Sequence, residues 1–416
     1  LLILLGAPIG LTLAVLPIGY ILFTQELPLS VVPYQMYEAL DRAPLLAIPL
    51  FLLTGELMNT SQMTDRLLAL SRELVGRIRG GLAQVNIVIS MLFAGMNGSA
   101  VADTATVGAI LIPAMKKAGY SAAFSAAVTA ISSTIGGIIP PSIVMVLLAS
   151  GMGLSVGGLF AAGIIPGILI GAMLMGLTYF YAVARNYERN EDPFSFSRLF
   201  TAFNACAAAL TIPIVLVGGI VFGVFTATEA GAITAGIALV VGSFVYRTFT
   251  FQSLGGTLVR VVKLTAGVFI IIAAAGPFSW LLNRIGALQW LEGWLVSYAD
   301  TPLMFCVMLV GFIFIAGMVM DAVANIIVLG PTLVKAGVAA GFPELQVAIV
   351  VSVGFLLGTV TPPIGVCYFT AAFIANERLE KVAAALVPFI LLEVAALFLL
   401  LWIPALTMWL PGVLGL

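Results

Sequence analysis

Long apolar stretches recur along this chain, and they constrain its fold more than any other feature. Clear examples lie at residues 1–23, 164–184, 205–225, 303–320 and 384–403. Each is long enough to cross about 30 Å of hydrocarbon as a helix. Of the 416 residues, 62% are hydrophobic and only 8% are charged, whereas soluble domains carry about 25% charged residues. We therefore expect an all-α polytopic membrane protein.

The composition also excludes several classes of function. The net charge of −1 gives no basis for nucleic-acid binding. Histidine is absent, which removes the commonest general base and metal ligand. The cysteines Cys206, Cys306 and Cys367 lie in apolar runs without metal-like spacing, so we interpret them as small buried hydrophobes. We expect no enzyme activity and no organic cofactor.

Two interruptions break the helical pattern of the first half. Residues 81–119 contain a turn at Gly98 with an apolar limb of about 14 residues on each side, too short to span at 1.5 Å per residue. This pattern predicts a re-entrant helical hairpin. The second interruption, at 132–141, ends in Pro140 and Pro141, which remove backbone donors and disfavour helix before them. We expect the helix to break there.

The second half repeats these landmarks after the polar linker 186–197. AMKKAG (114–119) matches TLVKAG (332–337) at an offset of 218 residues, and IIPPSIVM (138–145) matches VTPPIGVC (360–367) at 222. Asp103 and Asp321 each precede a hairpin proline by ten residues. The sequence therefore predicts two repeats, expected to be inverted, each with a hairpin and a broken helix.

Duplicated, interrupted membrane segments are typical of the binding sites of secondary transporters. An unsatisfied peptide group facing lipid costs several kcal/mol, so unwound backbone is tolerated only beside a wet cavity or a bound ion. Half-helix starts offer N–H groups to an anion, and half-helix ends offer carbonyl groups to a cation. Simple kinks remain the alternative, although the matched copies count against them.

Several motifs resemble the large membrane subunit of tripartite ATP-independent periplasmic (TRAP) transporters of organic acids. The likeness extends from about residue 4 to 400. It is carried by DRAPLLAIPLFLLTGELM (41–58), GRIRGGLAQVNIVISMLFAGMNGSAVADTATVGAILIPAMKKAGY (76–120), AVTAISSTIGGIIPPSIVM (127–145), LFAAGIIPG (159–167), FTATEAGAITA (225–235) and GTVTPPIGV (358–366). The resemblance implies an elevator fold of the ion-transporter superfamily, with a scaffold and a mobile transport domain.

The resemblance also implies site residues at each hairpin tip and its broken helix. Neutral oxygen ligands suit Na⁺, the implied coupling ion. The implied Na⁺ ligands are Ser99, Ser133, Thr134, Gly136, Gly317, Gly358, Thr359 and Thr361. The implied substrate-binding residues are Asn97, Gly98, Ser99, Asp103, Asp321, Asn325, Thr361 and Pro362. The second hairpin segment, MVMDAVANIIVLGPTL (318–333), lacks an obvious basic residue for a carboxylate, so bound Na⁺ and helix N-termini are expected to supply the charge.

The same resemblance implies an organisation and partners. We expect scaffold helices and an amphipathic arm (residues 61–80, with four interleaved arginines) in 1–80, a first transport-domain half in 81–168, further scaffold and a second arm in 169–301, a second half in 302–390 and a C-terminal helix in 391–416. The expected setting is the bacterial inner membrane, as a multi-pass protein. The expected partners are the small membrane (Q type) subunit, a periplasmic substrate-binding (P type) protein and the lipid bilayer.

Other functions stay open at this stage. A stand-alone divalent-anion/sodium symporter would need no periplasmic partner, and a passive channel would not need alternating access. An intramembrane aspartyl protease would use Asp103 and Asp321, but the glycine-flanked setting of such aspartates is missing. Each aspartate also has a structural alternative, because it could cap a half-helix beside a tip.

Overall fold

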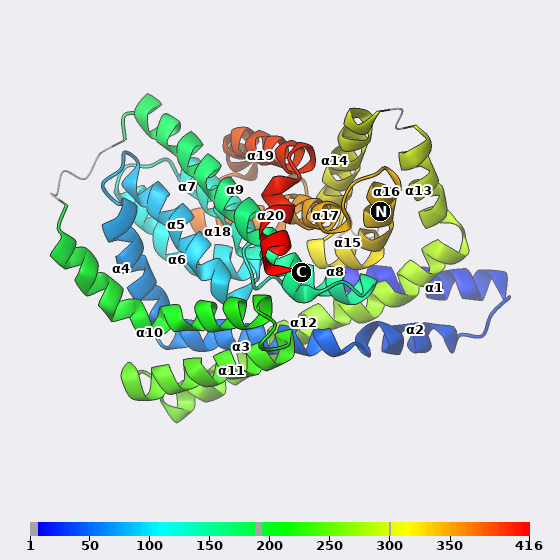
Figure 1. Cartoon of the computed structure of the whole chain (residues 1–416), viewed down its shortest axis with the longest axis horizontal. Coiled ribbons are helices and arrows are strands. Elements are labelled where there is room, and N and C mark those ends of the chain that lie inside the picture. The colour runs from blue at the N-terminus through cyan, green and yellow to red at the C-terminus, as the bar shows by residue number, and fades with distance from the viewer. Residues whose placement is uncertain (1–6, 188–193, 299–300) are drawn as a thin grey trace.

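The regular structure is helical throughout the residues that can be described, as the apolar stretches predict. The computed structural model describes residues 7–187, 194–298 and 301–416 (Figure 1). The first half contains α1 (Ile9–Thr24), α2 (Val31–Leu40), the 3₁₀ turn η1 (Ala43–Leu46), α3 (Ala47–Thr60), α4 (Met63–Val75), α5 (Gly81–Asn97), α6 (Ala100–Lys117), α7 (Ala122–Ile138), α8 (Ile143–Met152) and α9 (Val156–Ala184).

The second half largely repeats this order, with α10 added before the repeat and α20 after it. It contains α10 (Phe196–Val221), α11 (Ala227–Val240), the π-helical turn η2 (Val241–Val245), α12 (Phe251–Arg284), α13 (Ala287–Ser297), α14 (Pro302–Val319), α15 (Ala322–Val328), α16 (Gly330–Ala339), α17 (Glu344–Gly358), α18 (Val366–Ala375), α19 (Leu379–Trp402) and α20 (Ala405–Leu414). The predicted linker 186–197 lies partly outside the described residues.

Among the described residues, 8 helical segments are long and apolar enough to cross a membrane, or 9 if the bent pair α15–α16 is one span. The stretches 164–184, 205–225, 303–320 and 384–403 fall on α9, α10, α14 and α19. Residues 1–6 of the first expected stretch lie outside the described residues, and α1 covers the rest. The polytopic membrane fold is therefore confirmed.

Two helices, α7 and α17, form the centre of the molecule. Every residue of α7 from Phe124 to Ile138 is buried, and so is every residue of α17 from Gln346 to Gly358. Helices α5, α6, α9, α18 and α19 pack around α7, and α14, α15, α16 and α19 pack around α17. We call α5–α9 together with α14–α19 the hairpin body.

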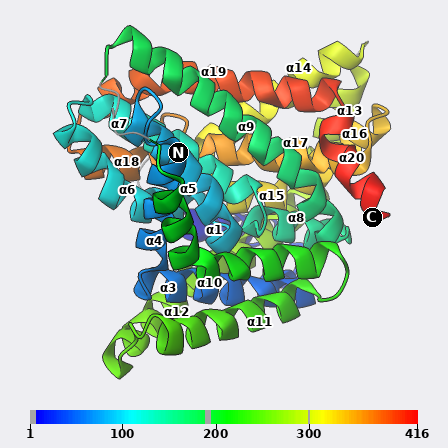
Figure 2. The ribbon, with the colours of Figure 1, turned by 60° about the vertical axis from the view of Figure 1, so that its left-hand side comes forward.

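A second group of helices lies along one side of the hairpin body. The 34-residue α12 packs against α1, α2 and α3, and α11 packs against α3 and α10. In Figures 1 and 2 these helices run below the hairpin body. We call α1–α3 and α10–α12 the framework layer. It contacts the hairpin body mainly through α12 against α15, α10 against α5 and α9, α3 against α5, and η1 against α8.

The repeat is more regular in the structure than in the sequence. Helices α6 and α15 begin at Ala100 and Ala322, and the hairpins end at Lys117 and Ala339, in both cases 222 residues apart. The offset of 222 seen at the double prolines therefore also holds for the hairpins. AMKKAG thus corresponds to AGVAAG (336–341) and not to TLVKAG, and its final glycine, Gly119, corresponds to Gly341. Both have positive φ, +86° and +92°.

Two expected local features differ from the structure. The limbs of the first hairpin are 17 and 18 residues long, not about 14, because α5 begins at Gly81 and α6 continues through Pro113 to Lys117. The amphipathic segment 61–80 forms α4, which buries Met63, Leu67 and Leu70 against α5 and α10. Helix α4 ends at Val75, so residues 76–80 of the predicted amphipathic segment lie beyond the helix.

Candidate functional site

The tip of the first hairpin lies directly against the break between α7 and α8. Gly98 joins α5 to α6 with a φ of +62°, which glycine adopts without a steric cost. The Ile143 N–H donates to the Gly98 carbonyl oxygen at 3.4 Å. A Cβ on Gly98 would lie 2.5 Å from the Pro141 carbonyl oxygen. The two backbones therefore meet too closely for a side chain at position 98.

Hydroxyl groups gather beside this contact. The Ser99 side chain caps α6 by accepting from the Ala102 N–H at 3.4 Å, which satisfies one of the unpaired donors at a helix start. The hydroxyls of Thr104 and Ser133 are 2.6 Å apart and hydrogen-bond to each other. They link the second limb of the hairpin to the broken helix.

A polar chain continues from α7 to the first limb, α5. The Asn86 amide donates to the Thr129 hydroxyl at 2.6 Å and accepts from Ser132 at 3.2 Å. Ser90 donates to Ser132 at 3.3 Å. All four of these side chains are buried, so the hairpin and the broken helix are joined by satisfied polar contacts.

Asp103 is the unsatisfied group in this region. Its side chain has no exposed surface, and a Cβ on Gly136 would lie 3.4 Å from the Asp103 Cβ. Neither carboxylate oxygen meets the geometry of a hydrogen bond with a described residue, although the Ser90 hydroxyl lies close enough to interact with the carboxylate. Because an isolated buried carboxylate costs several kcal/mol or more, this position suits a bound cation or a proton.

Thr134 faces a different partner from its neighbour Ser133. Its hydroxyl lies 2.6 Å from Oε1 of Glu393 on α19. Glu393 is 1% exposed, and its Oε2 has no partner among the described residues. Glu393 is not among the residues predicted from the sequence. The signal was present, because an acidic residue within an apolar membrane helix is functional by default.

The second tip meets the second break through two glycines. A Cβ on Gly317 would lie 2.9 Å from the Gly358 Cα, and a Cβ on Gly358 would lie 2.5 Å from the Gly317 Cα. Asp321, at the tip, caps α15 by accepting from the Val323 N–H at 3.0 Å. Here too the close approach is made by backbone, which only glycine permits.

Polar groups around the second break are mostly bonded to nearby backbone. The buried Asn325 amide donates to the Met320 carbonyl at 2.8 Å, while its Oδ1 has no partner in the described part of the chain. Thr359 and Thr361 donate to carbonyls in the preceding turn, at 2.6 and 2.8 Å. The hydroxyl lone pairs stay available to a cation. Half-buried Pro362 follows directly.

The two breaks meet at Cys367 on α18. This helix packs against α6 and α7. The buried thiol lies beside the hydroxyls of Thr104 and Ser133 from the first pair and of Thr359 from the second. The sequence predicted a small buried hydrophobe at this position, and nothing in the spacing of the cysteines indicated that it joins the two breaks.

The predicted site residues thus fall into two groups, one at each tip and break. The first contains Gly98, Ser99, Asp103, Ser133 and Gly136, with Thr134 turned toward Glu393. The second contains Gly317, Asp321, Asn325, Gly358, Thr359, Thr361 and Pro362. The side chain of Asn97 lies outside what the structure describes. Among the described residues no group of three or more His, Cys, Asp or Glu could hold a metal ion.

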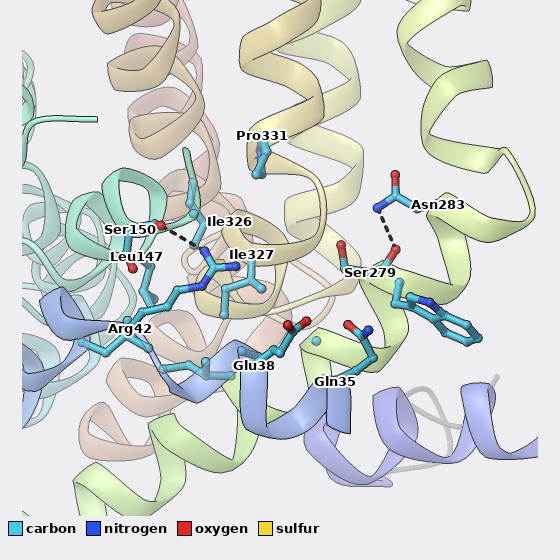
Figure 3. Close-up of a pocket in the computed structure, with 16 residues that line it drawn as sticks. Gln35, Glu38, Arg42, Leu147, Ser150, Ser279, Asn283, Ile326, Ile327 and Pro331 are labelled. Carbon is cyan, nitrogen blue, oxygen red and sulfur yellow. Dashed lines mark hydrogen bonds between the residues drawn. The ribbon is translucent and has the colours of Figure 1, made fainter. Parts of the chain in front are cut away.

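A cavity of about 350 Å³ separates the hairpin body from the framework layer (Figure 3). Arg42, directly after α2, donates from Nη1 to the Ser150 carbonyl oxygen near the end of α8, at 3.0 Å. The cavity is lined by Gln35, Glu38, Ala39, Arg42, Leu45, Leu147, Ser150, Gly151, Ile272, Gly276, Ser279, Trp280, Asn283, Ile326, Ile327 and Pro331. The sequence did not indicate this cavity.

A helical membrane fold with two hairpins, each closed over a broken helix, defines the class of this protein as a secondary transporter. The family model described as "Tripartite ATP-independent periplasmic transporter, DctM component" matches residues 1–406. The chain therefore belongs to the DctM family, the large membrane subunits of TRAP transporters. It is a multi-pass protein of the bacterial inner membrane and not an enzyme, and its partners are a small membrane subunit and a periplasmic binding protein.

Relatives and a solved structure agree with this assignment. The chain is 31% identical over 411 residues to the sialic acid TRAP transporter large permease SiaM of Vibrio cholerae, covering 98% of this chain and 95% of SiaM. It is 34% identical over 382 residues to the C4-dicarboxylate large permease DctM of Pseudomonas aeruginosa, covering 92% and 89%. The crystal structure of the Alcanivorax borkumensis YdaH transporter shares the fold, with a TM-score of 0.66, 15% identity, and 94% and 96% coverage.

Proposed function

We propose that this permease imports an organic acid anion by symport with Na⁺, in an elevator-type alternating-access mechanism. The anion is delivered by the periplasmic binding protein. The coupling ion binds beside each tip and break, and the hairpin body moves as a unit against the framework layer.

The observation that carries the proposal is a buried side chain with unsatisfied oxygen beside each hairpin tip. Asp103 at the first break and Asn325 at the second keep oxygens without partners among the described residues. Hydroxyls of Ser133, Thr359 and Thr361 lie in the same two regions. Oxygen ligands are what a hard cation prefers, and a bound Na⁺ would satisfy both sites.

The substrate is proposed to bind between the tips, where helices begin. Ser99 and Asp321 cap the starts of α6 and α15, and α8 and α18 begin at the two breaks. Helix N-termini attract anions through their free N–H groups and dipole. Asp103 is fully buried and negatively charged when ionised, so in this proposal it serves the cation, while Thr361 and Pro362 face the anion.

The elevator step is supported by how the two groups of helices meet. The hairpin body holds both tips and both breaks in continuous packing around α7 and α17. Its border with the framework layer is interrupted by the cavity beside α2 and α12. A partly unfilled border resists sliding less than a close-packed core does.

No single relative identifies the acid that this chain transports. The similar proteins are named for sialic acid in one case and for C4-dicarboxylates in another, at comparable identity. An organic acid anion is the class that both share, and we propose this class for the chain.

Uptake into proteoliposomes tests the proposal. The permease is reconstituted with its small subunit, its binding protein is added, and entry of labelled acids is measured with and without an inward Na⁺ gradient. We expect uptake only with the gradient. Equal uptake without the gradient would contradict Na⁺ coupling, and equal uptake without the binding protein would favour a stand-alone symporter.

Substitutions at the tips test the site. Ser99→Trp and Thr361→Trp are expected to abolish Na⁺-dependent uptake while expression and monodispersity are retained, because an indole at either position would occupy the space proposed for the ion and the anion. Trp at Phe244, which is exposed on the framework layer, is the matched control. Normal uptake by both tip variants would contradict the site assignment.

A further inference from the structure

The tip segment of the second hairpin, residues 318–333, has no basic residue to receive a carboxylate, yet the structure places an arginine facing it. Arg42 comes from the framework layer and faces Ile326 and Ile327 of α15 across the cavity (Figure 3). These residues follow Asp321 by five and six positions, roughly 8–9 Å along a helix at 1.5 Å per residue. The guanidinium therefore faces the part of α15 that lies one to two turns beyond the second tip.

Arg42 is held in place with donors to spare. Its Nη1 donates to the Ser150 carbonyl, and the described residues show no ion pair for it. A guanidinium has five N–H donors in a planar fork that matches a carboxylate. One side of the Arg42 guanidinium is thus anchored to the hairpin body, and its remaining N–H groups can donate hydrogen bonds to a ligand. The Ser150 Oγ beside it is buried without a partner in the described chain.

A negative group faces the same cavity without pairing with Arg42. Gln35, Glu38 and Arg42 are spaced three and four residues apart, which directs them to one side of α2 and its C-terminal end, and all three line the cavity (Figure 3). The Glu38 carboxylate accepts a hydrogen bond from the Tyr34 hydroxyl at 2.9 Å. This bond raises the pKa of Tyr34 above its usual value.

The cavity therefore offers three kinds of contact. Arg42 provides a cationic fork, Glu38 provides an acceptor that repels a second negative charge, and Leu147, Ile326 and Ile327 provide an apolar wall. Its volume of about 350 Å³ is near the lower end for small-molecule sites, which span roughly 300–1,000 Å³. A small acid with one carboxylate and several hydroxyl groups matches this arrangement.

We infer that the cavity is an organic-acid binding site in which Arg42 binds the carboxylate and Glu38 accepts hydrogen bonds from hydroxyl groups of the same molecule. The site prefers a hydroxylated monocarboxylate to a dicarboxylate. This inference rests on the proposed function, and it adds to the site between the tips a second position for the transported acid, between the framework layer and the hairpin body.

Direct binding measurements test the inference. The permease is purified with its small subunit in lipid nanodiscs at constant Na⁺, and calorimetry is performed with gluconate, succinate and sorbitol. We expect gluconate to bind most tightly, succinate more weakly because of Glu38, and sorbitol not at all because it lacks a carboxylate. No binding of gluconate, or equal binding of gluconate and sorbitol, would overturn the inference.

Variants assign the contacts. Arg42→Gln is expected to weaken gluconate binding by about ten- to a hundredfold, the usual effect of losing a charged hydrogen-bond partner, and Arg42→Lys by less. Glu38→Gln is expected to reduce the preference for gluconate over succinate. Arg284→Gln is the matched control, because Arg284 ends α12, pairs with Glu26 and does not line the cavity. Unchanged binding by Arg42→Gln overturns the inference.

A second variant keeps the inference testable if Arg42→Gln fails to fold. Ile327→Trp fills the cavity without altering any charge, and it is expected to abolish gluconate binding while the complex stays monodisperse. Retained binding would overturn the inference. Failure of the proposed function looks different: gluconate binding would still depend on Arg42, whereas uptake would proceed without a Na⁺ gradient.

Discussion

The two hairpin-and-break pairs of this permease share a backbone plan but differ in the side chains that occupy it. At the constant offset of 222 residues, Ser99 corresponds to Asp321, and both cap the second limb of a hairpin. Asp103 corresponds to Asn325, and both are buried with an oxygen that lacks a partner among the described residues. One pair therefore contains a carboxylate where the other contains an amide.

This difference separates the residues that the shared backbone arrangement requires from the side chains that are particular to each site. Both tips require glycine, because Gly98 meets Pro141 and Gly317 meets Gly358 backbone to backbone. The first pair adds the buried, unpartnered carboxylate of Asp103 and the hydroxyls of Thr104 and Ser133. In the second pair the carboxylate of Asp321 is bonded to the start of α15, and the other groups are carbonyls, an amide and two threonines. We expect the first site to depend on charge and the second on backbone geometry.

The largest expected effect comes from adding a side chain at either backbone contact. Gly98→Val and Gly358→Val should each reduce Na⁺-dependent uptake by about a hundredfold or more, because the new atoms overlap backbone that cannot move aside, and overpacking alone costs about 1–3 kcal/mol. Uptake in proteoliposomes measures this. Gly311→Ala in α14 is the control, since a Cβ there meets nothing within 4 Å. If one glycine tolerates valine, the two contacts are not equivalent.

Exchanging the residue types at the two corresponding positions, Asp103 and Asn325, tests the charge difference between the sites. Asp103→Asn should raise the Na⁺ concentration for half-maximal uptake by about tenfold, because a charged ligand contributes about 1.5–3 kcal/mol. Asn325→Asp should change it less, since the amide position already lies among neutral oxygens. Na⁺ titration of uptake provides the measurement. Equal shifts in the two variants would remove the proposed distinction.

Thr134 is expected to contribute to stability more than to ion binding. Thr134→Val leaves Glu393 without its hydroxyl partner, and we expect a loss of about 1–3 kcal/mol in the free energy of unfolding with an unchanged Na⁺ half-saturation. Thermal unfolding of the purified protein and Na⁺ titration measure the two quantities. Ser133→Ala is the comparison, because Ser133 bonds Thr104 at the first site and should affect Na⁺. The reverse result would make Thr134 the ion ligand.

The smallest expected effect concerns a contact that only the first hairpin makes. Lys116 Nζ donates to the Ala375 carbonyl at the end of α18, at 2.7 Å, whereas the corresponding residue of the second hairpin is Val338. A cation at a helix C-terminus contributes about 0.3–1 kcal/mol, so Lys116→Met should lower the unfolding temperature only slightly. Lys117→Met controls for the charge. A large loss would mean that this contact holds the two halves together.

Much of this architecture could be predicted from the sequence because it depends on local chemistry. The apolar lengths indicated the spans, and the turn at Gly98 and the double prolines indicated the hairpin and the breaks. The sequence predicts the wrong partner for AMKKAG in the second hairpin, because TLVKAG resembles AMKKAG more closely than AGVAAG does. The fold instead matches Gly119 to Gly341, since both end a hairpin at positive φ.

The sequence alone determined that this chain enters a membrane as two copies of an interrupted helical unit, because hydrophobic length, glycine and proline act on their own segments. Only the tertiary structure decided that Gly317 touches Gly358, that Thr134 faces Glu393, and that Arg42 stands before the second hairpin. The residues of these pairs lie 41 to 285 positions apart, and the most distant, Arg42 and Ile327, line the same cavity. Their geometry depends on how whole helices pack, which no local pattern specifies.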